Sequence, residues 1–222
     1  MQDLTLVIPA KHESESLPIF LKEINHFLCK KIIVLDENDL KTIDAIKNFN
    51  EIEILYQKKI GYGSALIEGI NSVNTTFFCI INADGSMNPS YLPSMLEKVK
   101  NKNLDFLFAS RYEKPVGGSD DDNFITSIGN FFFTSIGNLF FSLNISDILF
   151  TYVLGKKKNF QNLKITSEDF TFCVEFPIKA KLQRTKYETI PSYERNRIGG
   201  FKKVNAFKDG LLILLKMVKM FF

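Results

Sequence analysis

The sequence predicts an α/β protein with a mostly parallel sheet that is flanked by helices. Short apolar segments typical of strands alternate with segments of helical spacing through the first half of the chain. The most continuous apolar segment, Phe77–Ile81, is typical of a strand buried in a parallel sheet. Polar or acidic residues directly follow three of these strands. Because open α/β sheets bind ligands beyond the carboxyl ends of their strands, we expect the functional site at that edge.

The elements expected in the first half follow a β-α-β order. Strands are expected at residues 4–9, 31–36, 52–56, 77–81 and 104–109. Helices are expected after Ser16, at about residues 41–49, after the glycine-containing segment Gly61–Leu66, and from about Pro89. This order predicts right-handed crossovers between parallel strands.

The second half begins with a Phe-rich repeat. Residues 126–133 and 134–141 each carry Thr-Ser-Ile-Gly-Asn followed by three apolar residues, and they predict a helix that is apolar nearly all round. We expect this helix to be buried on one side and to face a membrane on the other. Residues 145–182 are less regular, and Glu188–Pro191 is typical of an edge strand.

The last residues differ from the rest in composition. We expect one domain over residues 1–208, followed at 209–222 by an apolar helix with interspersed lysines. That composition is typical of an amphipathic helix at a membrane interface, and packing against the domain is the alternative.

Length and composition limit the classes of function. The 222 residues suffice for one large α/β domain, and 45% apolar residues supply a sizeable core. The formal net charge of +3 is too small to indicate a nucleic-acid partner. Three widely spaced cysteines in apolar segments favour reduced thiols. No segment approaches the ~18 apolar residues of a membrane-spanning helix. We therefore expect a cytoplasmic protein that is soluble or peripheral at the inner face of a membrane.

The strand end at Asn82–Ser86 is the first candidate site. Asn82 and Asp84 are two residues apart, so their side chains lie on the same side of the chain. Oxygen ligands of this kind suit a hard divalent cation, which would carry phosphates with it. The alternative is that Asp84 only caps the turn or the helix that follows.

Two further loops carry groups that suit phosphate. Gly61 and Gly63 open a helix whose N-terminus could hold an anion, and the alternative is an ordinary tight turn. The loop between Tyr193 and Val204 contains two arginines and two lysines, which predicts a mobile cationic clamp for phosphate oxygens. A solvated charged loop is the alternative there.

Acidic residues elsewhere have two interpretations each. Asp120–Asp122 indicates a solvated loop or a helix N-terminus. Glu175 lies within an apolar segment, so its carboxylate needs a partner. That partner is either part of a functional site or a lysine or arginine in a structural ion pair.

Eight segments occur in the order in which one enzyme family carries its motifs. They are Ile8–Glu13, Val34–Asn38, Gly61–Leu66, Asn82–Ser86, Ala109–Tyr112, Asp147, Val174–Glu175, and Arg197 with Gly200 and Lys203. Over roughly residues 4–208 the chain resembles a family 2 glycosyltransferase with the GT-A (Rossmann-like) fold. Within that family it is most similar to the branch of dolichol/polyprenyl-phosphate mannosyltransferases.

The resemblance implies a role for each matching residue. Contacts with the nucleotide would come from Pro9, Ala10, Glu13, Asp36, Gly61, Gly63 and Asn82. Asp84 and Ser86 would hold a Mg²⁺ or Mn²⁺ ion. The acceptor would contact Arg111, Asn130 and Asp147. The catalytic residues implied are Asp84, Asp147, Glu175, Arg197 and Lys203.

The chain departs from the family pattern at several positions. Asn82 replaces the first acid of the metal motif, and Leu35 stands where the family has a strand-end Asp. Phe150–Tyr152 replaces a Ser-Gly-Phe sequence, and the helix after Tyr112 lacks basic residues common in lipid-phosphate transferases. The motifs therefore support the donor site better than the acceptor site.

The expected activity is inverting transfer of a sugar from a GDP- or UDP-sugar to a lipid phosphate or a glycan in cell-envelope glycan synthesis. A phosphate acceptor needs no general base, whereas a hydroxyl acceptor would use Asp147, Glu175 or Asp169. The alternatives are the same fold acting on a soluble or surface-glycan hydroxyl, and a nucleotide-sugar-binding protein without catalysis. The sequence leaves open whether the chain forms homo-oligomers.

Overall fold

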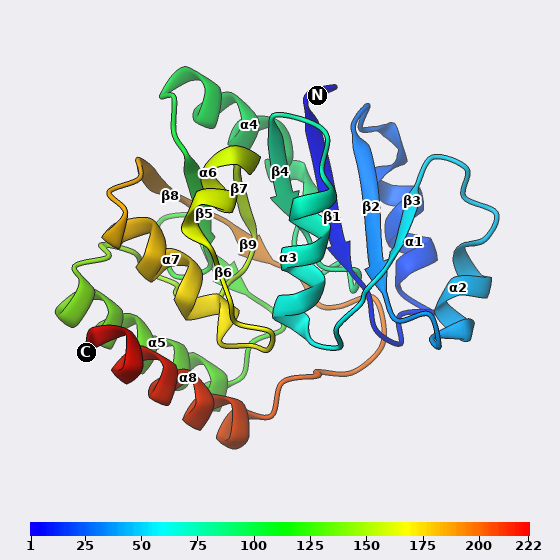
Figure 1. Ribbon diagram of the computed structural model, residues 1–222. Helices are drawn as coiled ribbons and strands as arrows, with labels where there is room; N and C mark the ends of the chain where they lie inside the picture. Colours follow the sequence, from blue (N-terminus) through cyan, green and yellow to red (C-terminus); the bar gives the residue numbers. More distant parts are fainter.

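The computed structural model describes all 222 residues, which form a seven-stranded sheet with helices on both faces (Figure 1). The strand order is β3-β2-β1-β4-β7-β5-β8. The strands are β1 (Leu4–Pro9), β2 (Lys30–Leu35), β3 (Glu53–Tyr56), β4 (Phe77–Ile80), β5 (Phe106–Ser110), β7 (Val153–Lys156) and β8 (Tyr187–Pro191). β7 runs antiparallel to both of its neighbours, and every other pair of adjacent strands is parallel. The predicted α/β class with a mostly parallel sheet is confirmed.

β7 is a strand that the sequence pattern does not indicate. It lies within the irregular segment 145–182 and runs antiparallel between β4 and β5. Gly155 of β7 lies against the ring of Phe106, where a Cβ would clash. β8 pairs with β5 and ends the sheet, as predicted for an edge strand. A separate two-stranded sheet joins β6 (Gly118–Ser119) to β9 (Tyr193–Glu194).

The helices divide the core into two layers, one on each face of the sheet. One layer receives α1 (Leu17–Glu23) with the short η1 (Ile24–His26), α2 (Leu40–Ile46), and η2 (Pro89–Tyr91) leading into α4 (Leu92–Asn101). The other receives α3 (Tyr62–Ser72), α6 (Lys157–Leu163) and α7 (Phe172–Leu182). Within β1, Leu6 and Ile8 face the first layer and Val7 faces the second, because successive side chains of a strand alternate.

Two further helices, α5 (Phe124–Phe141) and α8 (Ala206–Phe221), lie side by side at one border of the molecule (Figure 1). α8 begins three residues earlier than the sequence predicts. Ile213 and Met217 of α8 join a third apolar cluster with residues of α5 and α7, such as Phe133 and Val174. The C-terminal helix therefore packs against the domain on one face.

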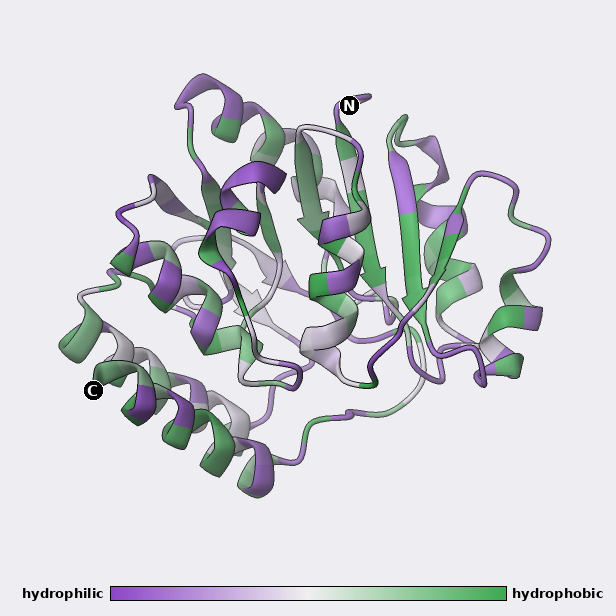
Figure 2. Ribbon diagram, viewed as in Figure 1, coloured by the Kyte–Doolittle hydropathy of each residue, from purple (hydrophilic) through white to green (hydrophobic).

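α5 is long and apolar enough to cross a membrane by length and composition, so the expectation that no segment reaches that size is wrong. Three of its polar side chains, however, are bonded to the segment that follows it. Asn138 exchanges hydrogen bonds of 2.8 and 3.1 Å with the backbone of Ile145, and Thr134 accepts one of 3.2 Å from Ile148. α5 thus lies along the domain with one side held by it. Both α5 and α8 carry many apolar residues (Figure 2).

Candidate active site

Three neighbouring parallel strands deliver their following loops to one edge of the sheet. β1 lies between β2 and β4, so Ala10, Asp36 and Asn82 follow adjacent strand ends. The N–H of Ala10 donates to the carbonyl of Val34 at 2.8 Å. Asp36 accepts two bonds of 2.9 Å from Asn38, and these lower the pKa of its carboxyl group. The convergence of polar groups predicted for this edge is present.

Asp84 lies in the turn after β4 with only 13% of its side chain exposed. Its Oδ1 accepts hydrogen bonds from the backbone N–H (3.0 Å) and the hydroxyl (2.9 Å) of Ser86. Its Oδ2 lies 3.7 Å from Nη1 of Arg197. Nearby, the amide oxygen of Asn82 accepts a bond of 3.2 Å from the hydroxyl of Tyr62. Asp84 therefore caps its turn with one oxygen and meets a cation with the other.

The loop that follows β9 folds directly over this turn. The N–H of Arg195 donates to the carbonyl of Ser86 at 2.9 Å, and the N–H of Ile198 donates to that of Asp84 at 2.8 Å. The guanidinium of Arg195 reaches the carbonyl of Gly85 at 2.7 Å. Gly85 has a φ of 73°, and the side chain of Ile198 occupies the space that a Cβ would need. The basic loop and the Asp84 turn form one packed unit.

Asp121 binds Arg197 on the side of the guanidinium that faces away from Asp84. Its Nε and Nη2 donate to the two carboxylate oxygens of Asp121 at 3.0 and 2.6 Å, which leaves Nη1 on the side of Asp84. Burial alone would raise the pKa of Asp121, but the bonds from Arg197 outweigh it and the pKa is lowered. With 13% of its side chain exposed, Asp121 does not belong to a solvated loop, so that interpretation of the acidic triplet is wrong for this residue.

A second pair joins the same loop to the segment after β1. The carboxylate of Glu13 is buried and accepts hydrogen bonds from the ammonium group of Lys203 and the hydroxyl of Ser16. The N–H of Glu13 donates to the hydroxyl of Thr42 at 3.0 Å. Both basic groups predicted to bind phosphate are thus paired with acids, and a diphosphate would compete with those acids for them.

The glycines at the start of α3 are covered by another part of the chain. A Cβ at Gly61 or Gly63 would clash with the backbone carbonyls of Ser167 and Glu168. The N–H of Ser64 donates to the carbonyl of Glu168 at 3.0 Å. The glycines are therefore required for close packing, and a carbonyl already occupies this helix N-terminus. Their contact with a nucleotide stays a prediction.

Arg111 and Asp147 form a buried ion pair at the end of β5. Nε and Nη2 of Arg111 donate to the two oxygens of Asp147 at 2.7 and 3.0 Å, and the backbone N–H of Arg111 adds a third bond at 3.0 Å. Nη1 reaches Glu194 at 3.1 Å. Burial alone would lower the pKa of Arg111, yet the charge of Asp147 raises it. Because both oxygens of Asp147 are held and its side chain is fully buried, the structure does not offer it as a free base.

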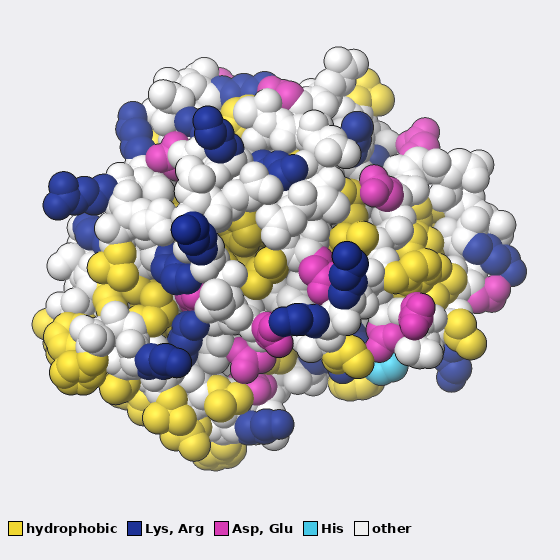
Figure 3. Space-filling model, viewed as in Figure 1, with side chains coloured by type: hydrophobic (Ala, Val, Ile, Leu, Met, Phe, Trp, Pro, Cys, Tyr) yellow, Lys and Arg dark blue, Asp and Glu magenta, His cyan; other side chains and the backbone are white.

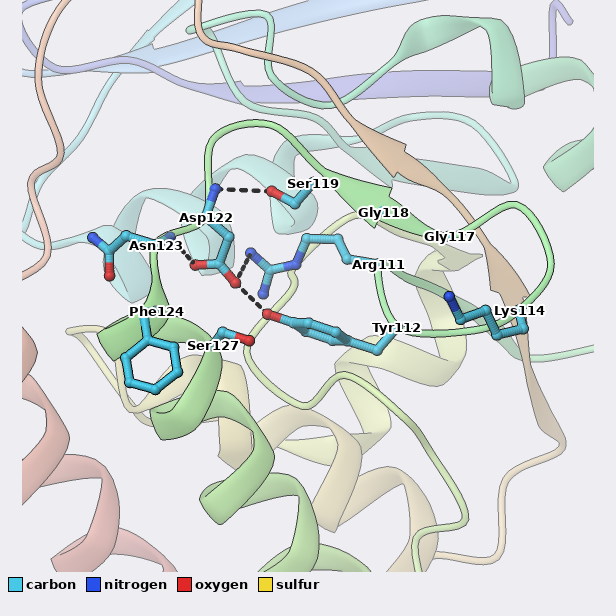
Figure 4. A pocket seen from close by; sticks show the side chains of 10 residues that line it. All are labelled: Arg111, Tyr112, Lys114, Gly117, Gly118, Ser119, Asp122, Asn123, Phe124 and Ser127. Carbon is cyan, nitrogen blue, oxygen red and sulfur yellow. Dashed lines mark hydrogen bonds and ion pairs between the residues drawn. The ribbon is translucent and has the colours of Figure 1, made fainter.

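A pocket of about 500 Å³ lies beside this ion pair, between the loop after β5 and the first turn of α5. Figure 4 shows Arg111, Tyr112 and Asp122 pointing toward one another at its wall, with Phe124 on the helix below them. The pocket is lined by Arg111, Tyr112, Lys114, Gly117, Gly118, Ser119, Asp122, Asn123, Phe124 and Ser127. Of the predicted acceptor residues, only Arg111 reaches it.

Two predicted site residues, Glu175 and Asn130, are instead buried and bonded to other parts of the protein. Glu175 is 1% exposed and accepts bonds from Lys179 (2.6 Å), Lys216 (3.1 Å) and the N–H of Ser167 (2.7 Å). This is the structural ion pair that the sequence left as the alternative, and it contradicts a catalytic role because no substrate can reach the carboxylate. Asn130 is also 1% exposed and accepts a bond of 3.1 Å from Leu149. It is buried in the domain and is not among the residues that line the pocket.

Asp169, the third candidate base, lies in the turn before α7. One of its oxygens accepts hydrogen bonds from the N–H (2.9 Å) and the hydroxyl (2.5 Å) of Thr171. Its other oxygen accepts no hydrogen bond and the residue is exposed, so only Asp147 and Glu175 of the three candidate bases are fully engaged within the protein.

Residues 5–164, well over half of the chain, match the model of the family described as glycosyl transferase family 2. The chain belongs to glycosyl transferase family 2. Within this family, uncharacterised glycosyltransferases of Mycobacterium bovis and Mycobacterium tuberculosis are 30% identical to it over 115 residues. That region is 52% of this chain and 50% of theirs, so the match spans half the length of these relatives.

Solved structures confirm the fold of this family 2 chain. Glucosyl-3-phosphoglycerate synthase from Mycobacterium tuberculosis, crystallised with Mn²⁺, UDP and phosphoglyceric acid, superposes with a TM-score of 0.71 at 9% identity. The superposition covers 98% of this chain and 78% of that one. A crystal structure of the same synthase with Mg²⁺ and UDP gives a TM-score of 0.69 at 9% identity, with the same coverage of both chains. The GT-A-like arrangement predicted from the motifs is thus correct.

The groups at the Asp84 turn of this family 2 chain fit a divalent cation that is shared with a phosphate ligand. No cluster of three or more His, Cys, Asp or Glu side chains forms anywhere in the chain, so no all-protein cage exists. Mg²⁺ commonly binds through one or two carboxylates together with substrate phosphates and water. The carboxylate of Asp84 and the neutral oxygens of Asn82 and Ser86 make up a donor set of that kind.

Sequence reasoning missed Asp121 and Tyr62. The only signal for Asp121 is its place in an acidic triplet, whose partner Arg197 lies 76 residues away. Tyr62 stands between the two glycines, and its hydroxyl bridges Asn82 (3.2 Å) and Thr151 (2.6 Å). A pattern in one chain cannot show such bonds, because they form only when distant segments fold together.

Proposed function

We propose that this chain transfers a sugar, with inversion at the anomeric carbon, from a nucleoside-diphosphate donor such as a UDP- or GDP-sugar. The observation that carries the proposal is the packing of the Arg197 loop on the Asp84 turn at the carboxyl edge of the sheet. A carboxylate and a guanidinium thus lie together at the edge where open α/β sheets bind ligands, which supports a diphosphate site there. UDP occupies the solved glucosyl-3-phosphoglycerate synthase, which has the same fold, and this supports the proposal.

The chemistry follows from where charge develops. When the acceptor oxygen bonds to the anomeric carbon, the bond to the diphosphate oxygen breaks and the diphosphate leaves with the electron pair. Arg197 and Lys203 would stabilise that negative charge once they exchange their carboxylate partners for phosphate oxygens. Asp84, Asn82 and Ser86 would hold Mg²⁺ or Mn²⁺, which supplies further charge neutralisation when bound.

The hydrogen bonds of the candidate general bases help to decide which class of acceptor the chain uses. Asp147 and Glu175 are buried with both carboxylate oxygens bonded, which leaves the exposed Asp169, with one oxygen free, as the one candidate base for a hydroxyl. An acceptor that is already a phosphate anion needs no such base. Because two of the three candidate bases are buried and fully bonded, we favour a lipid phosphate over a glycan hydroxyl, in the polyprenyl-phosphate branch of the family and in cell-envelope glycan synthesis. The pocket beside Arg111, which carries Lys114 and Phe124, is the proposed place for the acceptor.

The test is turnover of a panel of GDP- and UDP-sugars with Mg²⁺ or Mn²⁺, with a polyprenyl phosphate or the matching polyprenyl alcohol as acceptor. The proposal predicts transfer from one donor to the phosphate but not to the alcohol, and loss of about 10²–10³-fold in kcat for Asp84→Ala. Transfer to the alcohol alone would refute the phosphate acceptor. Donor binding without turnover under every condition would indicate a binding protein instead.

A further inference from the structure

α5 and α8 together present a large exposed apolar surface, here called the α5–α8 face. Its exposed side chains are Phe124, Ile125, Ile128, Phe131, Phe132, Leu139 and Phe140 from α5, and Phe207, Leu211, Leu212, Leu215, Val218, Phe221 and Phe222 from α8 and the residue after it. Figure 3 shows apolar side chains gathered along the border where these helices lie. Monomeric soluble proteins rarely expose contiguous apolar patches of more than a few hundred Å².

The α5 half of the face carries no charge. None of its 18 residues is Asp, Glu, Lys or Arg. Even the exposed Ser135 satisfies its hydroxyl within the helix, by donating to the carbonyl of Phe131 at 2.7 Å. At about 100° per residue, the exposed apolar side chains of α5 cover roughly half of its circumference. A helix surface of this kind suits a medium that offers no hydrogen bonds.

The charge that borders the α8 half is positive. On the same helical projection, the exposed Lys208 and Lys219 lie together near one edge of the apolar arc, between Leu215 and Leu212. The one acid of α8, Asp209, is bonded to the N–H of Asn205 at 2.7 Å at the start of the helix. Lys216 lies on the same flank of α8, just beyond Leu212, and is paired with Glu175. The free charges beside the apolar arc are therefore lysines, which complement an anionic surface.

We propose that the α5–α8 face docks on an anionic lipid bilayer, with both helices lying in the plane of the interface. Apolar bulk with lysines at its border is the composition of interfacial helices, whose binding combines apolar burial with attraction to anionic lipids. α5 does not cross the bilayer in this arrangement, because Asn130, Thr134 and Asn138 bond it to the domain. The proposal does not depend on the sugar chemistry and holds for the chain with or without a donor.

The test is flotation of the purified full chain with vesicles of phosphatidylcholine alone or mixed with phosphatidylglycerol. We expect binding to the anionic vesicles, weaker binding at high salt, and little binding to phosphatidylcholine alone. The double substitution Phe131→Ser with Leu215→Ser should reduce partitioning about tenfold or more, because each removes exposed apolar bulk that the bilayer would bury. Lys208→Glu with Lys219→Glu should abolish the preference for anionic vesicles.

The matched control changes one exposed leucine and one exposed lysine at the opposite end of the sheet, Leu28→Ser with Lys30→Glu. All these side chains are exposed, so unfolding temperatures should stay close to that of the parent chain.

The proposal would be refuted if the parent chain did not float with anionic vesicles, or if binding survived the Phe131 and Leu215 substitutions. A dimer in detergent-free buffer that these substitutions dissociate, without vesicle binding, would assign the face to a second copy. Donor binding to the same variants, measured without lipid, separates failure here from failure of the transferase proposal.

Discussion

At the residue scale, the site depends on how a single guanidinium is oriented. Asp121 takes Nε and Nη2 of Arg197, so Nη1 is the group left toward Asp84. Bidentate pairing fixes both the position and the plane of an arginine fork. Asp121 is therefore a positioning residue, which acts on the diphosphate only through Arg197.

Asp121→Asn should weaken donor binding more than it slows the chemical step. The amide keeps its size but loses the charge that holds Arg197, so we expect the donor KM to rise about tenfold with kcat within about threefold of the parent. Steady-state kinetics with the donor varied measure this split. Asp120→Asn is the matched control, because Asp120 contacts the hydroxyl of Tyr193 at 2.6 Å and not the basic loop. An unchanged KM, or equal losses in the two variants, would contradict the positioning role.

At the scale of elements, the Gly61 and Gly63 loop looks like a binding motif in the sequence but is required for packing in the fold. The start of α3 lies so close to residues 167–169 that Gly63 has no room for a side chain. A methyl group would meet two backbone carbonyls, and backbone cannot move aside as a flexible side chain does. The motif is thus required for joining α3 to the segment before α7, whatever else it binds.

Gly63→Ala should lower the free energy of unfolding by about 1–3 kcal/mol, the usual cost of overpacking. Gly129→Ala in α5 is the matched control, since a Cβ there meets nothing within 4 Å. Removing a glycine from a helix interior in open space should stabilise by about 0.5–1 kcal/mol. Urea unfolding followed by circular dichroism gives both values. A Gly63→Ala variant as stable as the parent would show that residues 167–169 move away freely.

Much of the architecture could be predicted because it depends on local patterns. Apolar segments of four to six residues, helical spacing and a Gly or Pro at their ends marked most strands and helices in order. β7 could not be predicted, because its four residues show no alternation of apolar and polar side chains. Its neighbours in the sheet also come from distant parts of the sequence. The site divides in the same way. The Asp84 motif is local and was found, whereas the partners of Arg197, Asp147 and Glu175 are set by long-range folding.

At the scale of the whole molecule, Glu175 joins three parts of the chain. It binds Lys179 on its own helix, Lys216 on α8, and the N–H groups of Thr166 and Ser167 in the segment that covers Gly61 and Gly63. Burial alone would raise the pKa of Glu175, but the bonds from Lys179, Ser167 and Lys216 lower it to about 2. One carboxylate thus ties the apolar C-terminal helix to the loop next to the active site.

The stability that Glu175 contributes should depend on pH with a definite sign. Its pKa is lower in the folded chain than the value of about 4.3 in an unfolded one, so folding is favoured above that pH and the gain is lost as pH falls toward 2. Glu175→Gln should therefore lower the free energy of unfolding by about 2–3 kcal/mol at pH 7, with the deficit shrinking between about pH 4.5 and 2. Denaturant unfolding of both chains across this pH range measures the deficit.

Glu188→Gln is the control, because Glu188 also pairs with two lysines but is 34% exposed, and such surface pairs contribute at most about 1 kcal/mol. A deficit for Glu175→Gln that stays constant or grows in acid would show that the two lysines do not stabilise its charge.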